Sequence, residues 1–118
     1  MTQADRATLE RLFAEANNLL ANGNARAALT LAQQAWNLAP LEADCSNLVG
    51  VCAITLGDAA TAGQCWHEAI RLNPRTAEAR INLARWHRDS GRLAEAEACL
   101  RQATAFAPRN ATISLLLG

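Results

Sequence analysis

Lysine is missing from this chain of 118 residues, and arginine alone supplies its eleven basic side chains. Eleven acidic side chains balance them, so the formal net charge at pH 7 is zero. A neutral chain carries no overall field that attracts polyanions. We therefore expect neither nucleic acid nor a membrane surface among its partners.

Long apolar runs are also missing. The chain has no stretch of about 18 consecutive apolar residues, which a membrane-spanning helix needs. Its amino terminus lacks the basic start and apolar stretch of a secretory signal. The four cysteines form no CxxC pair and stand at Cys45, Cys52, Cys65 and Cys99. Free thiols in the cytoplasm are the expected state.

Residues for catalysis or cofactor binding are few. The glycines stand singly, so no glycine-rich loop is present to cradle a phosphate. Cys65 and His67 fall on roughly opposite sides of a helix and make no nucleophile–base pair. Cys65, His67 and Cys99 lack the clustered spacing of a metal site. The sequence predicts no enzyme, no cofactor and no metal site.

What the sequence does contain is a period of 34 residues. Three sets of small or helix-breaking residues recur at this interval: Gly23, Gly57 and Gly91; Ala28, Ala62 and Ala96; Pro40, Pro74 and Pro108. A fixed period in this range is typical of proteins built from stacked structural repeats.

Each period predicts a unit of two helices. Glycine permits the left-handed backbone of the turn between them, and proline ends the second helix. The complete units are 9–42, 43–76 and 77–110, and 111–118 begins a fourth. The first helices, called helix A, are expected at 4–21, 43–56 and 77–90; the second, called helix B, at 25–38, 59–72 and 93–106. No strand pattern is present, so the predicted fold class is all-α.

The second unit carries the residues of a known pattern, W-x2-L-G-x2-Y, then A-x3-F, then P. Val49-Gly50 stands for the Leu-Gly pair, and Ala62, Trp66 and Pro74 follow in place. The chain resembles the tetratricopeptide repeat family over residues 9–118, although the tryptophan position is lost in all three units. The resemblance implies a single domain, 1–118, folded as a right-handed superhelical α-solenoid of antiparallel helix pairs, about seven helices in all.

One face of helix A changes character between units. The second unit places mostly apolar residues on it: Cys45, Val49, Cys52 and Leu56. The first unit places polar residues at the matching positions: Arg11, Glu15, Asn18 and Asn22. Because burying charged and amide groups is costly, we expect the first unit to be a solvent-facing amino-terminal cap.

The other end of the sequence is apolar. Ile113 and Leu117 continue the apolar face of helix A, so this segment is expected to pack on the third unit. Repeat arrays need a polar outer end for solubility. We therefore expect the natural chain to continue past Gly118, with a short native final helix as the alternative. Self-association is a further expectation, through Ile113, Leu115, Leu116 and Leu117.

The resemblance also implies a binding surface, because the family forms its concave, partner-binding face largely from helix A. Carried over by the 34-residue interval, the positions are Phe13, Asn17, Leu20, Asn47, Leu48, Val51, Ile54, Ile81, Asn82, Arg85 and Arg88. An acidic row borders them at Glu10, Asp44 and Glu78. We expect a protein or peptide partner with apolar anchors at one end and acidic groups near Arg85 and Arg88.

One subtype of the family clamps a terminal carboxylate with five Lys, Arg and Asn residues on helix A. The matching positions here are Phe13, Asn17, Leu48, Glu78 and Asn82, of which only Asn17 agrees. Glu78 repels a carboxylate, so this clamp is not expected.

The leading functional hypothesis is a non-enzymatic protein-interaction module that uses its concave face. The alternative is a regulatory or substrate-docking arm at the amino terminus of a larger bacterial enzyme, such as a glycosyltransferase or a methyltransferase, for which family analogy is the only support. A third hypothesis is a structural spacer that contacts a neighbouring subunit through its last residues.

Overall fold

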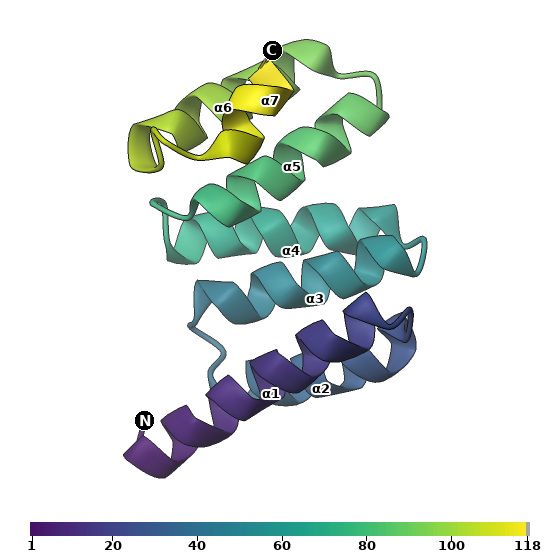
Figure 1. The fold of residues 1–118 in the computed structure, drawn as a ribbon, viewed down its shortest axis with the longest axis vertical. Coiled ribbons are helices and arrows are strands. Elements are labelled where there is room, and N and C mark those ends of the chain that lie inside the picture. Colours follow the sequence, from purple (N-terminus) through teal and green to yellow (C-terminus); the bar gives the residue numbers. More distant parts are fainter. Residues whose placement is uncertain (118) are drawn as a thin grey trace.

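The computed structural model describes residues 1–117, and this part of the chain folds into seven helices with no strand (Figure 1). Their bounds are α1 Gln3–Ala21, α2 Ala25–Leu38, α3 Ala43–Thr55, α4 Ala59–Leu72, α5 Ala77–Asp89, α6 Leu93–Phe106 and α7 Ala111–Leu117. The predicted all-α class is confirmed, and each predicted boundary lies within one residue of the observed one. The partial repeat predicted at 111–118 is seen up to Leu117, because Gly118 lies outside the described residues.

Glycine makes the turn inside each helix pair. The φ angles of Gly23, Gly57 and Gly91 are 79°, 86° and 81°, a left-handed conformation that glycine adopts without steric cost. A Cβ added at any of the three would meet no atom within 4 Å. These turns therefore depend on the conformational freedom of glycine and not on the space around it.

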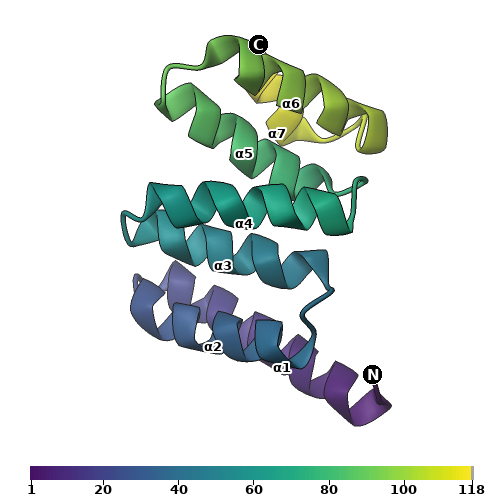
Figure 2. The ribbon, with the colours of Figure 1, turned by 180° about the vertical axis from the view of Figure 1, so that it is seen from behind.

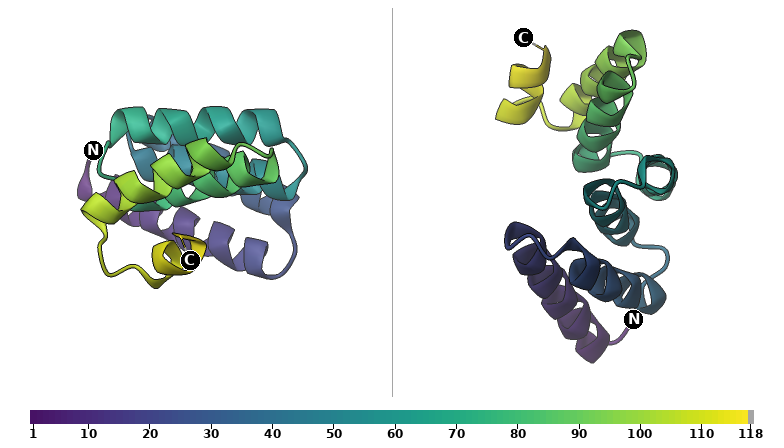
Figure 3. Two further views of the ribbon diagram at one scale, coloured as in Figure 1. Left: turned by 90° about the horizontal axis from the view of Figure 1, so that it is seen from above. Right: turned by 90° about the vertical axis from the view of Figure 1, so that its right-hand side faces the viewer.

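The helices stack along the long axis of the molecule, whose extents are 41 × 28 × 22 Å. Helices α1, α3, α5 and α7 lie on the face turned to the viewer in Figure 1, and α2, α4 and α6 lie on the face seen from behind in Figure 2. The side view on the right of Figure 3 shows the stack curving towards the side of α1 and α7. The predicted arrangement of helix A on the concave face is thus observed.

Tryptophan rings pack on glycines where helices cross. The Trp66 ring on α4 lies so close to Gly50 on α3 that a Cβ there would be 2.6 Å from its Nε1. The Trp86 ring on α5 lies on Gly63 of α4, where a Cβ would be 2.7 Å from Cζ2, and its Nε1 donates a hydrogen bond to the Ala59 carbonyl at 2.9 Å. The first contact joins the helices of one unit, and the second joins successive units.

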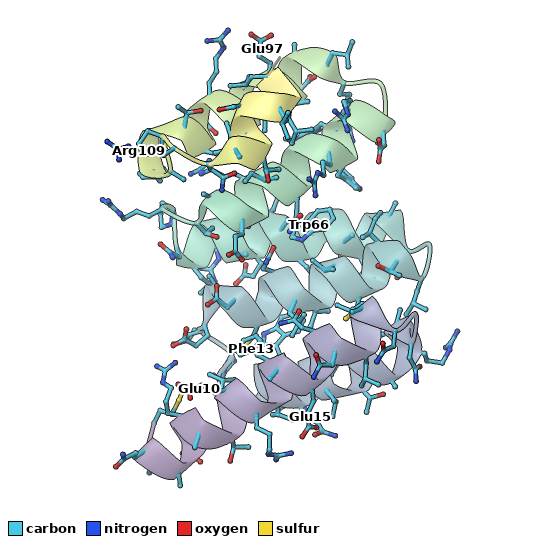
Figure 4. The ribbon with its side chains drawn as sticks, in the orientation of Figure 1. Glu10, Phe13, Glu15, Trp66, Glu97 and Arg109 are labelled. Carbon is cyan, nitrogen blue, oxygen red and sulfur yellow. The ribbon has the colours of Figure 1, made fainter. Side chains whose placement is uncertain are left out.

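The two ends of the stack differ in polarity, as predicted. The four polar residues of the first unit are exposed: Arg11, Glu15, Asn18 and Asn22. In Figure 4, Glu15 lies on the side of α1 that faces away from α3. At the other end, Ile113 is only 3% exposed and packs into a core cluster with Ala84 and Leu100 of α5 and α6. The predicted packing of the last segment on the third unit is therefore confirmed.

The α4 helix carries a cap that responds to acid. Hydrogen bonds from the side chain and the backbone N–H of Thr61 hold the pKa of Asp58 below its ordinary value. A lowered pKa stabilises the folded state above the unfolded-state pKa, and this contribution is lost as the pH falls through the folded-state pKa. We expect Asp58→Asn, which keeps a capping oxygen, to reduce the loss of stability between neutral and acidic pH. Urea unfolding at several pH values measures this, and an unaltered acid profile would contradict it.

Candidate functional site

The concave face holds a groove of about 480 Å³. Helices α1, α3 and α5 form most of it, and the start of α7 closes one end. The residues that line it are Phe13, Asn17, Asp44, Asn47, Leu48, Val51, Glu78, Ile81, Asn82, Arg85, Asn110 and Thr112. Its volume lies within the range of small-molecule and peptide side-chain pockets.

Apolar side chains form the floor of the groove. Leu48 and Ile81 are each 6% exposed and belong to the core clusters of the stack. Phe13 and Val51 are half-buried and pack against core clusters, so each shows part of its surface to the groove. In Figure 4, Phe13 lies on the side of α1 that faces α3. Because the floor is continuous with the core, its side chains are held in place before any ligand binds.

Two amides bridge neighbouring repeats in the groove. The Nδ2 of Asn82 on α5 donates a hydrogen bond to the Oδ1 of Asn47 on α3 at 2.9 Å. Both residues are half-buried. After this bond is made, Asn47 retains its N–H donors and Asn82 retains its carbonyl acceptor. The pair thus offers a donor and an acceptor side by side.

Three charged side chains border the groove, and all three are exposed: Asp44, Glu78 and Arg85. Four ion pairs occur among residues 1–117, and none of them includes these three. Asp44 and Glu78 are each the second residue of a helix, where an acid also interacts favourably with the helix dipole. No ion pair within residues 1–117 therefore neutralises the charged edge of the groove.

Eight of the eleven residues predicted for partner binding line this groove. The three that do not are Leu20, Ile54 and Arg88. Each stands ten residues after a member of the acidic row, which is about 15 Å along the helix axis. The residues of α1, α3 and α5 that line the groove all stand within seven residues of that row, so the groove ends before these three positions.

Several lining residues were not among the predicted site residues. Asp44 and Glu78 belong to the acidic row, and Thr112 continues it, since it lies 34 residues after Glu78. The 34-residue interval had already placed Asp44 and Glu78 beside the predicted site, and it would have found Thr112 as well. The interval does not point to Asn110. This residue lines the groove as the cap of α7, where its Oδ1 accepts hydrogen bonds from two backbone N–H groups.

The last helix borders a second, smaller cavity of about 190 Å³ between α5, α6 and α7. Arg88, Leu116 and Leu117 line it, so Arg88 belongs to a different surface from Arg85. Of the residues predicted for self-association, Ile113 lies in the core, Leu116 is half-buried, and Leu115 and Leu117 are 81% and 40% exposed. Of these four residues, Leu115 and Leu117 therefore supply the exposed apolar surface at this end.

The side chains that could support chemistry lie in unreactive settings. Burial, with smaller contributions from Glu42 and Asp44, raises the pKa of the Cys45 thiol to about 11, and burial also raises the pKa of Cys65. Burial lowers the pKa of His87, whose ring lies edge-on to Trp86. A thiol with a raised pKa is a poor nucleophile at neutral pH. Residues 1–117 contain neither a group of acidic, His and Cys side chains that could hold a metal ion nor a helix suited to crossing a membrane.

The family is decided by two sequence models described as tetratricopeptide repeat, which match residues 13–64 and 53–118. The chain belongs to the tetratricopeptide repeat family. The second match alone covers more than half of the sequence. The recurring glycine, alanine and proline positions are therefore the positions of this repeat.

Solved structures share the fold. The Yersinia enterocolitica type III secretion translocator chaperone SycD is similar with a TM-score of 0.85 and 21% identity, over 95% of this chain and 89% of that chain. The first TPR of Spaghetti (RPAP3), bound to HSP90 peptide SRMEEVD, gives 0.83 and 16%, over 94% and 88%. A Thermobaculum terrenum O-GlcNAc transferase mutant gives 0.89 and 23%, over 99% of this chain but only 22% of that chain. At these identities the similarity shows the fold alone, and no curated protein matches the sequence.

The residues of the carboxylate clamp are largely absent from this groove, although the fold is shared. Phe13, Leu48 and Glu78 stand at three of the five clamp positions, and all three line the groove. Two of them are apolar, and the carboxylate of Glu78 is exposed there. That this groove does not clamp a terminal carboxylate stays an expectation.

Proposed function

We propose that this chain is a non-enzymatic protein-interaction module that binds a peptide segment of a partner protein in the groove of α1, α3 and α5. The observation that carries the proposal is the groove itself, which combines an apolar floor with unpaired polar groups on its edge. Apolar anchors supply affinity, and polar groups fix orientation. Two similar solved structures hold a segment of a partner: the first TPR of Spaghetti is bound to an HSP90 peptide, and PcrH is in complex with the chaperone binding region of PopD.

The cysteines of the chain favour a binding function over a catalytic one. The raised pKa values of Cys45 and Cys65 make these thiols weak nucleophiles. All four cysteines are free thiols, which supports the cytoplasmic location that we propose. The similarity to the O-GlcNAc transferase covers a small part of that chain and concerns the fold alone.

Val51 offers a direct test, with Ile54 as a matched control. Both lie on α3 with partly exposed side chains, but Val51 lines the groove and Ile54 does not. Peptides selected from a random phage-displayed library on the wild-type chain should bind Val51→Asp at least tenfold more weakly, because a carboxylate then faces the apolar part of the ligand. Ile54→Asp should bind them as the wild type does. Equal binding by all three proteins would reject the groove.

A further inference from the structure

One edge of the groove is acidic. Glu10, Asp44 and Glu78 stand 34 residues apart, at the same position of the first helix in successive repeats. Asp44 and Glu78 line the groove, and Figure 4 shows Glu10 on the same side of α1 as Phe13. None of the three carboxylates takes part in an ion pair within residues 1–117. A ligand thus meets a row of uncompensated negative charge.

The groove contains fewer basic side chains than the sequence predicted. The expected anion site needed Arg85 and Arg88 together, but Arg88 lines the cavity beside α7. Arg85 remains as the one guanidinium among the groove residues, against the two carboxylates of Asp44 and Glu78. It stands seven residues after Glu78 on α5, which is about 10 Å along the helix axis. This separation is comparable to the Debye length of about 8 Å at physiological salt, so screening weakens the repulsion between Arg85 and a cation at the acidic edge.

The Asn47–Asn82 pair lies about one helical turn from the acidic edge, beside the apolar floor. Asn47 follows Asp44 by three residues on α3, which is about one helical turn. Its N–H donors and the Asn82 carbonyl match the C=O and N–H of a single residue in an extended peptide, which point to the same side of the chain. Contacts of this kind hold a peptide through its main chain and leave the side chains to select the sequence.

We propose that the groove binds an extended peptide in which a lysine or arginine lies beside an apolar residue. The cation contacts Asp44 and Glu78, the N–H and C=O of one extended residue pair with Asn82 and Asn47, and the apolar side chain packs on Val51 and its neighbours. This inference rests on the proposed function, because it specifies the partner of the same groove. Charge complementarity selects the basic peptide over an acidic one.

Two synthetic peptide libraries of equal length test the inference. One has lysine fixed at its centre, the other has glutamate, and all other positions are random. Peptides whose binding to the wild-type chain depends on Val51 should come mainly from the lysine library. Their affinity should fall as salt is raised, because exposed charges are screened.

Variants of the acidic edge identify the contact. Asp44→Asn/Glu78→Gln should bind the selected lysine peptide roughly five- to tenfold more weakly, as expected for two exposed ion pairs, and should lose most of the salt dependence. Asp89→Asn/Glu95→Gln removes the same charge from exposed residues outside the groove and should bind as the wild type does. Thermal unfolding of each variant checks that the fold is intact.

The possible failures are distinguishable. One failure is that the selected peptides depend on Val51 but come from the glutamate library, and another is that Arg85→Gln abolishes their binding. Either result would reject a basic partner but would leave the groove as the binding site. If the two double variants weaken peptide binding equally, only the overall charge of the chain matters. That result would also reject the contact of a basic residue with Asp44 and Glu78. If neither library yields a peptide whose binding depends on Val51, both the proposed function and this inference are rejected.

Discussion

Trp66→Ala should lower the free energy of unfolding by about 3–5 kcal/mol, the usual cost of truncating a buried tryptophan. Trp66 is 3% exposed and belongs to the core cluster that joins α3, α4 and α5. It lies in the middle repeat, and in a repeat array the stability of each unit depends on its neighbours. The substitution should therefore also lower the stability of the first and third repeats.

Urea unfolding followed by circular dichroism measures this loss. Trp66→Leu is the graded control, because Leu100 fills the matching position in the third repeat and is also buried. This substitution should cost clearly less than Trp66→Ala. A cost below about 1 kcal/mol for Trp66→Ala, a value typical of surface or volume-conserving changes, would show that the ring is not part of the core.

Gly50→Ala should also destabilise the fold, although alanine is the better helix former. The added Cβ would be 2.6 Å from Nε1 and 2.9 Å from Cδ1 of Trp66, and such overpacking costs about 1–3 kcal/mol. The higher helix propensity of alanine offsets about 1 kcal/mol of this. We expect a net loss of up to about 2 kcal/mol in the wild-type background.

The sign should reverse when the ring is removed. The third repeat has Ala84 and Leu100 where the second has Gly50 and Trp66, so the combination of alanine with leucine already occurs in this fold. Gly50→Ala introduced into the Trp66→Leu variant should therefore stabilise it, by up to about 1 kcal/mol. Urea unfolding of the four proteins forms a double-mutant cycle. Additive effects would contradict the contact between the two residues.

The fold could be predicted from the sequence because its determinants are local and repeated. Gly23, Gly57 and Gly91 must adopt positive φ, and this requirement is visible as a glycine at a fixed interval. Pairing of Gly50 with Trp66 is not visible in the same way. It depends on the distance between two helices, and the interval relates positions in different repeats but not positions that touch within one.

The groove could be predicted in part, for a related reason. The interval placed Phe13, Asn47, Val51 and Arg85 on one surface, and they line the groove together. It could not separate Arg88 from Arg85, because that depends on where the groove ends along α5 and on where α7 packs. The charge balance of the groove, on which the proposed ligand depends, therefore came only from the structure.

The central claim is that a peptide partner binds the concave face of α1, α3 and α5. Chemical-shift mapping by NMR tests it most directly, with the isotope-labelled chain titrated with a peptide selected from the lysine library. The account predicts the largest shifts at Phe13, Asn47, Val51, Ile81 and Asn82, with small shifts on α2, α4 and α6. Shifts concentrated on those three helices, or on the exposed leucines of α7, would contradict it.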